Sequence, residues 1–117
     1  MKALLLTILA FAASAQQTAP RPETVMVTCH AKTGAEAELQ RVLTRHWTTV
    51  RDLKLVRDAP HLSLRGVSNG ETYFVEIFTW RDAAIPDHAP APVQAIWAEM
   101  NKLVDGRGIE IAVVTPY

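Results

Sequence analysis

The chain has 117 residues, of which 49% are hydrophobic, and it balances 12 basic against 12 acidic side chains. This length fits one domain, and the balanced charge argues against binding to nucleic acid or to an anionic membrane, because both need a clustered basic excess. Since Cys29 is the one cysteine, an intramolecular disulfide and a metal site built only from cysteines are excluded.

The first fifteen residues are typical of a secretory signal peptide. Lys2 supplies a positive charge, residues 3–12 form a short apolar run, and Ala13-Ser14-Ala15 provides a small-residue cleavage site. A transmembrane helix needs about 20 apolar residues, so this run is too short to span a bilayer. We expect residues 1–15 to be removed and the mature protein to be periplasmic or extracellular, with no membrane contact. The alternative is a buried N-terminal helix. The polar, proline-containing residues 16–23 are predicted to be a linker.

The first half of the mature chain predicts a strand and a helix. Residues 24–31 alternate between apolar and polar side chains, as a half-buried strand does. Thr33 and Glu36 then fit a capping box, and apolar side chains recur at helical spacing over residues 39–50. We expect this helix to end before Pro60, whose ring cannot continue it.

The second half predicts a hairpin, a helix and a final strand. Two strand-like runs, residues 61–67 and 72–80, flank Asn69-Gly70, a pair that favours a tight turn because both residues tolerate positive φ. Apolar spacing predicts a helix over residues 93–103, followed by a strand over residues 109–115. The order β-α-β-β-α-β is that of the ferredoxin-like α+β fold, an antiparallel four-stranded sheet with both helices on one face.

Many strand positions of this sheet are apolar on both faces. A turn at Asn69-Gly70 places Leu62, Leu64, Val75 and Ile77 on one aliphatic face of the hairpin, which we expect to be ordinary core. Because the helices cover only one face, the second face is predicted to be buried against another copy of the chain in a homodimer. An edge-to-edge tetramer is the alternative.

The opposite face of the hairpin combines aromatic and ionisable side chains, and Glu76 is its most informative member. Glu76 lies between Phe74 and Phe78, where burial of a carboxylate is costly unless it is paired or protonated. Arg65 lies diagonally across the two strands, within reach of a salt bridge. Two interpretations stay open, a satisfied Arg65–Glu76 ion pair and a catalytic base or ligand-orienting carboxylate with a shifted pKa.

The histidines offer fewer signals. His88 lies in a proline-rich loop after the third strand, where a catalytic acid or base and a plain surface histidine are both consistent with its position. His46 lies on the packed side of the first helix, and we interpret it as a core residue. His30 and His61 lack metal-ligand spacing, and no phosphate-binding or metallopeptidase motif occurs, so we expect no metal and no bound cofactor.

The mature chain resembles the dimeric α+β barrel superfamily, and within it the antibiotic biosynthesis monooxygenase (ABM)-like proteins. Residues 32–36, 75–84 and 92–97 together with His88 carry this resemblance, which spans nearly the whole mature domain. It implies an ABM-like dimeric α+β barrel over residues 24–117, with a small apolar or aromatic molecule bound between sheet and helices. It also implies cofactor-free oxidation of polyphenolic rings as one activity among several in the superfamily.

The resemblance and the sheet pattern together predict a set of site residues. We expect Glu76 and His88 to be the catalytic bases. The residues expected to contact substrate are Arg65, Phe78, Trp80, Tyr73 and Trp47. The alternative is a homodimer of the same fold that binds a ligand or serves a structural role without catalysis.

Overall fold

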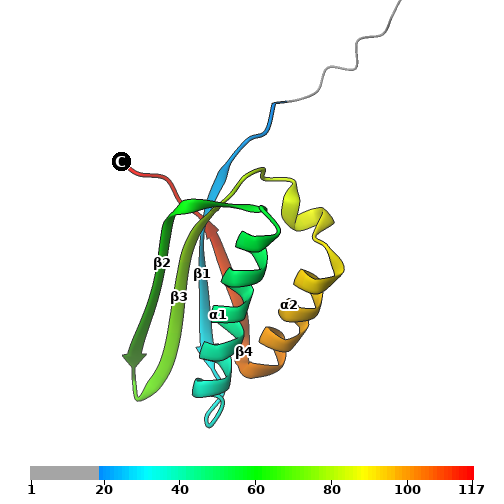
Figure 1. Ribbon diagram of the computed structural model, residues 1–117. Coiled ribbons are helices and arrows are strands. Elements are labelled where there is room, and N and C mark those ends of the chain that lie inside the picture. Colours follow the sequence, from blue (N-terminus) through cyan, green and yellow to red (C-terminus); the bar gives the residue numbers. More distant parts are fainter. Residues whose placement is uncertain (1–18) are drawn as a thin grey trace, which may run out of the picture.

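The computed structural model describes residues 19–117, which form a four-stranded sheet with two α-helices on one face (Figure 1). The elements in chain order are β1 (Glu23–Ala31), α1 (Glu36–Asp52), β2 (Val56–Ser68), β3 (Glu71–Trp80), the short 3-10 helix η1 (Ile85–His88), α2 (Ala91–Leu103) and β4 (Val104–Val113). The strands pair antiparallel in the order β2-β3-β1-β4. The predicted ferredoxin-like β-α-β-β-α-β fold is therefore confirmed.

The N-terminal predictions lie largely outside the described residues. These include the expected signal peptide, residues 1–15, and the first part of the expected linker. Residues 19–22 have no regular structure, and β1 begins at Glu23, one residue before the predicted start. Within residues 19–117, no helix is long and apolar enough to cross a membrane.

The β2–β3 hairpin has the predicted register. Asn69 and Gly70 adopt φ values of 53° and 74°, which a type I′ turn requires and which suits the twist of the two strands. The pairing then runs without interruption to His61, which lies opposite Phe78. Side chains that the sequence assigns to one face of the hairpin therefore share that face in the structure.

The start of α1 differs from the prediction. The residue before the helix is Ala35, and no side chain caps the first turn, so the capping box of Thr33 and Glu36 does not form. Gly34 adopts a φ of 87° and turns the chain immediately before the helix. As a result Glu36 is the first helical residue and lies too early in the helix to act as the second member of a capping box.

Two strands also begin earlier than predicted. β2 begins at Val56 and passes through Pro60, which is tolerated because β2 is an edge strand and its pairing with β3 shifts at this point. β4 begins at Val104, directly after α2, and not at residue 109. The two glycines that follow α2 therefore lie within a strand.

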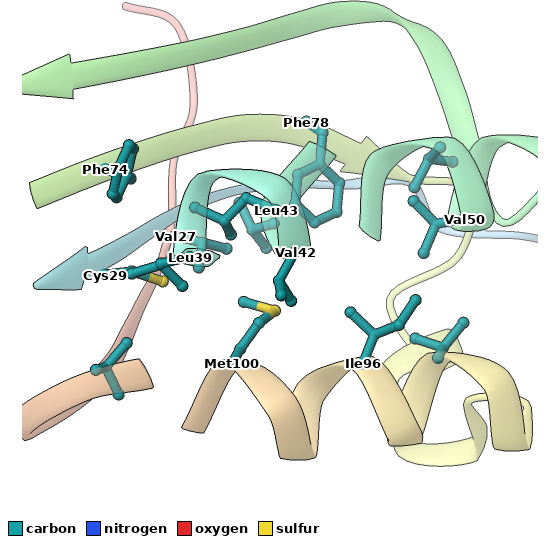
Figure 2. Packing of buried hydrophobic residues seen from close by; sticks show 14 of the residues in the cluster. Val27, Cys29, Leu39, Val42, Leu43, Val50, Phe74, Phe78, Ile96 and Met100 are labelled. Atoms are coloured by element: carbon teal, nitrogen blue, oxygen red, sulfur yellow. The ribbon is translucent and has the colours of Figure 1, made fainter. Parts of the chain in front are cut away.

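The core fills the space between the sheet and the helices. Figure 2 shows side chains of α1, such as Leu39 and Val42, directed toward Met100 of α2 and toward Cys29 and Phe78 of the sheet. Leu39 is fully buried and Cys29 is only 1% exposed. The helices thus cover the aromatic face of β3, and this face forms the core.

The aliphatic face of the hairpin is not core in a single chain, contrary to the prediction. Leu62 and Leu64 are each 51% exposed, whereas Val75 and Ile77 beside them are half-buried. Both helices pack on the opposite face of the sheet, so nothing within residues 19–117 covers this one. An uncovered apolar face of this kind is typical of a surface that meets a partner.

Candidate functional site

An apolar cavity of about 450 Å³ lies between the sheet and α2, and we call it the central cavity. Phe78 and Trp80 of β3 and Trp97 of α2 contribute aromatic rings to its wall. The rings pack edge to face, since the Phe78 and Trp80 centroids are 5.0 Å apart and those of Trp80 and Trp97 are 6.3 Å apart. The aliphatic side chains of the lining are Val25, Val27, Met100, Ile109 and Ile111.

His46 of α1 is the buried polar residue of the central cavity. Trp97 Nε1–H donates a hydrogen bond to His46 Nε2 across a distance of 2.9 Å. An indole nitrogen only donates, so Nε2 carries no proton and the neutral ring must carry its proton on Nδ1. Burial lowers the pKa of His46 to about 4, which keeps the ring neutral near pH 7.

The Nδ1–H of His46 is available to a ligand. Within residues 19–117, every side-chain nitrogen or oxygen atom that is completely buried has a hydrogen-bond partner. Nδ1 of His46 has no partner in this range, so it is not completely buried, and the cavity that His46 lines is the space open to it. Two carboxylates, Glu23 and Asp87, lie elsewhere in the lining. The central cavity therefore offers the His46 N–H, the Asn101 amide and two carboxylates inside a largely apolar wall.

Glu76 occupies a different place, between α1 and the edge strand β2. Its Oε2 accepts a hydrogen bond from Ser63 Oγ at 2.7 Å and lies 3.3 Å from His61 Nε2. Glu76 is 9% exposed, and burial raises its pKa against the opposing effect of the hydrogen bonds from Ser63 and His61. The His61 ring stacks on Trp47, with centroids 3.6 Å apart and an interplanar angle of 6°.

Ser63, His61 and Glu76 do not form a hydrolase triad. In such a triad the serine and the carboxylate bind different nitrogens of the imidazole, so that the histidine can pass a proton between them. Here Ser63 Oγ, at 3.2 Å, and Glu76 Oε2, at 3.3 Å, both approach His61 Nε2. The arrangement stabilises a buried carboxyl group and does not activate the hydroxyl.

The Arg65–Glu76 ion pair, one of the two interpretations of Glu76 from the sequence, does not form. Arg65 Nη1 instead donates to Gln40 Oε1 of α1 at 3.0 Å, and the guanidinium lies 5.6 Å from the centre of the Phe74 ring. The Glu76 carboxyl group contacts Ser63 and His61 instead. Arg65 and Glu76 nevertheless line the same hollow of about 190 Å³, which a second hollow of about 370 Å³ adjoins through shared residues. We call these joined hollows the β2 trough.

The predicted site residues are thus divided among several places. Phe78 and Trp80 line the central cavity, whereas Glu76 and Arg65 line the β2 trough, and the two sites share no lining residue. Trp47 lines neither site, although its ring lies 6.3 Å from Phe78 and so belongs to the layer between them.

The last two predicted residues lie further away. His88 is exposed at the end of η1 and lines a small hollow of about 230 Å³ with Leu55 and Asp82. Tyr73 lies on the uncovered face of the sheet, where its ring covers Gly66 and lies 5.9 Å from the ring of His30. The structure therefore does not bring His88 and Tyr73 to the central cavity.

Sequence reasoning missed His46 and Trp97 as site residues and interpreted His46 as a core residue. A histidine on the buried stripe of an otherwise apolar helix face was the available signal, because a buried imidazole needs a hydrogen-bond partner. Its partner could not be read from the sequence, since Trp97 lies 51 residues further along the chain.

Comparison with solved structures identifies the fold. A protein from Caulobacter crescentus CB15, described as a candidate antibiotic biosynthesis monooxygenase, superposes with a TM-score of 0.65 over 85% of this chain and 92% of its own, at 15% identity. SnoaB, a cofactor-independent oxygenase from Streptomyces nogalater, gives a TM-score of 0.62 over 83% of this chain and 95% of its own, at 20% identity. This chain has the ABM fold.

A third structural neighbour, Rv0793 from Mycobacterium tuberculosis, gives a TM-score of 0.63 at 18% identity and covers 83% of this chain and 96% of its own. No protein-family model matches the sequence, and no curated protein does. The resemblance to ABM-like proteins that the sequence suggested is therefore confirmed at the level of the fold. At these identities the ABM fold does not by itself assign a reaction.

Proposed function

We propose that this ABM-fold protein binds a small aromatic molecule in the central cavity and oxidises it with O₂, without a metal or flavin. The observation that carries the proposal is His46, which lines a cavity walled by Phe78, Trp80 and Trp97 and whose Nδ1 is left free by the hydrogen bond at Nε2. Ligand sites of this kind are mostly apolar and contain few polar groups that fix orientation. SnoaB, which shares the fold, is a cofactor-independent oxygenase.

The chemistry requires the substrate to become an electron-rich anion before it meets O₂. A phenol in the cavity would lose its proton to Asp87 or Glu23, the two carboxylates of the lining. His46 Nδ1–H would donate to the resulting phenolate oxygen, which stabilises the negative charge where water is scarce. The anion then transfers electrons to O₂, so that one oxygen atom enters the ring system as a carbonyl and the other leaves as water with the two displaced hydrogens.

We further propose that the protein is exported and works as a homodimer. Residues 1–15 have the pattern of a signal peptide, which supports a periplasmic or extracellular location. The uncovered sheet face, with Leu62 and Leu64 half-exposed, supports association through that face. No nucleic acid or membrane surface is proposed as a partner, because the basic and acidic residues are equal in number.

Oxygen uptake by the mature protein tests this function. A panel of quinols and other polyphenols should raise the melting temperature, and at least one should consume O₂. His46→Leu should remove uptake and retain binding, because leucine fills the site but cannot donate to the phenolate. Arg51→Gln changes an exposed residue at the end of α1, outside the central cavity, and is the matched control.

The outcomes separate the proposed oxidation from the alternative. Stabilisation by ligands without O₂ consumption would leave a binding protein and refute the oxidation. Neither stabilisation nor uptake across the panel would favour a structural dimer. Uptake that survives in His46→Leu would refute the role assigned to His46.

A further inference from the structure

We propose that the β2 trough is a second ligand site and that it binds a small monocarboxylate that also carries a hydroxyl group. The trough shares no lining residue with the central cavity, so this inference does not rest on the proposed oxidation. It rests on two side chains in its wall, Arg65 and Glu76, which face the same hollow without pairing with one another.

Two contacts position the exposed side chain of Arg65. Its Nη1 donates to Gln40 Oε1 at 3.0 Å and its guanidinium lies over the Phe74 ring, so both contacts restrict the side chain. Within residues 19–117 no carboxylate forms a salt bridge with Arg65. A guanidinium has five N–H donors in a planar fork, and the remaining donors match the two oxygens of a carboxylate.

Glu76 supplies the second contact. Its Oε2 is occupied by Ser63 and His61, whereas Oε1 has no hydrogen-bond partner within residues 19–117. Every side-chain nitrogen or oxygen atom in this range that is completely buried has a hydrogen-bond partner. Oε1 is therefore not completely buried, and the hollow that Glu76 lines is the space open to it. A hydroxyl group donates to an ionised carboxyl and accepts from a protonated one, so it suits Glu76 in either state.

The size and charge of the trough narrow the ligand class. The hollow shared by Arg65 and Glu76 has a volume of about 190 Å³, which is enough for a small organic molecule. A second carboxylate on the ligand would meet the Glu76 side chain, which disfavours dicarboxylates. Arg65 and Glu76 are diagonal neighbours on β2 and β3, so the carboxylate and the hydroxyl must lie close together on the ligand.

Three probes of nearly equal size test the inference on the mature protein. Lactate has both groups, propionate lacks the hydroxyl, and lactamide lacks the charge. In ¹H–¹⁵N spectra at constant ionic strength, lactate should cause saturable shifts at Arg65 and Ser63. Propionate should bind about tenfold more weakly and lactamide should cause no saturable shift, because a hydrogen bond to a charged group is worth about one power of ten.

Variants assign the contacts. Arg65→Gln should weaken lactate binding at least about tenfold, whereas Arg51→Gln, an exposed arginine outside the trough, should leave it unchanged. Glu76→Leu should abolish the preference for lactate over propionate while the affinity for propionate stays the same. Dispersed spectra of each variant verify folding, and Arg65→Lys, which keeps the charge and loses the fork, should be intermediate.

Clear results would overturn the proposal. An absence of saturable lactate shifts up to about 100 mM, far above the millimolar range of weak specific sites, would remove the site. Equal affinity for lactate and lactamide would show that Arg65 does not recognise the charge of the carboxylate. If Glu76→Leu still preferred lactate over propionate, Glu76 would not be the residue that binds the hydroxyl group. The wild-type comparison of the three probes decides the question even if a variant fails to fold.

Discussion

Trp97 Nε1 lies 2.9 Å from His46 Nε2, and this contact between α2 and α1 determines which nitrogen of the imidazole carries the proton. The tryptophan N–H can only donate, so protonation of Nε2 would break the hydrogen bond and set two donors against each other. Burial lowers the pKa of His46 to about 4, and a donor facing Nε2 also favours the neutral ring.

Trp97→Phe should raise the pKa of His46 from its value of about 4. The variant keeps an aromatic ring in the wall but removes the donor that opposes protonation of Nε2. The increase should stop short of 6.5, because the site stays buried. A ¹H–¹³C NMR titration of the His46 Cε1–H measures the change, and Trp47→Phe, which alters the partner of His61 instead, is the control. An unchanged pKa in Trp97→Phe would contradict the role of the hydrogen bond.

Acidification should destabilise the fold through His46. Its pKa is about 4 in the folded state and near 6.5 when unfolded, so the unfolded chain binds the proton more tightly. The free energy of unfolding should therefore decrease as the pH falls from 6.5 to 4, by about 3 kcal/mol from this residue alone. Urea unfolding across this range measures the slope. His46→Leu should flatten it, and an equal slope in the variant would assign the effect elsewhere.

Glu76 should change the free energy of unfolding with pH in the opposite direction to His46. Burial raises its folded-state pKa above the ordinary value of 4.5, so ionisation destabilises the folded protein as the pH rises through this range. Glu76→Gln keeps an oxygen that accepts from Ser63 and cannot ionise. Its free energy of unfolding should therefore increase relative to wild type between pH 4.5 and pH 7. A relative stability that is independent of pH would show that Glu76 titrates normally.

A charge on the uncovered sheet face should dissociate the proposed homodimer. Leu64→Glu places a carboxylate at a position that is 51% exposed in one chain and would be buried in the pair. Burial of an unpaired charge costs several kcal/mol, so the dissociation constant should rise at least about a hundredfold. Leu53→Glu is the matched control, because Leu53 is 44% exposed at the end of α1, which packs on the opposite face of the sheet. Sedimentation velocity gives the result, and a wild-type monomer at micromolar concentration would refute the dimer.

Export should leave a mature chain that begins at Gln16. Expression of the full sequence in a Gram-negative host, followed by cell fractionation and mass spectrometry, should find the protein outside the cytoplasm without residues 1–15. Deletion of residues 2–15 should retain it in the cytoplasm. An uncleaved chain in the cytoplasm would support the buried N-terminal helix instead.

Local chemistry explains which parts of the fold could be predicted. The turn at Asn69-Gly70 depends on two adjacent residues, and it fixes the register of β2 against β3. The face that the helices cover could not be assigned in the same way, because both faces of β3 are apolar. Leu64 and Phe74 are equally suited to a core by composition, and only the packing of α1 and α2 distinguishes them.

Contacts between distant segments explain the errors at the candidate site. Arg65 was matched with Glu76 because strand pairing brings these residues close, but its partner Gln40 lies on α1, 25 residues earlier in the chain. The pairing of His46 with Trp97 likewise spans two helices. The hydrogen-bond partners of such side chains depend on how α1 lies on the sheet, and hydrophobic periodicity does not specify this position.

The single cysteine provides a direct measure of how often the core opens. Cys29 is 1% exposed beneath α1, and burial, with a smaller effect of Glu76, raises the pKa of its thiol to about 12 (Figure 2). A thiol in this state reacts with alkylating reagents only while the sheet and helices are separated. The labelling rate of Cys29 therefore reports native-state opening without any engineered probe, and a ligand that stabilises the closed core should slow it.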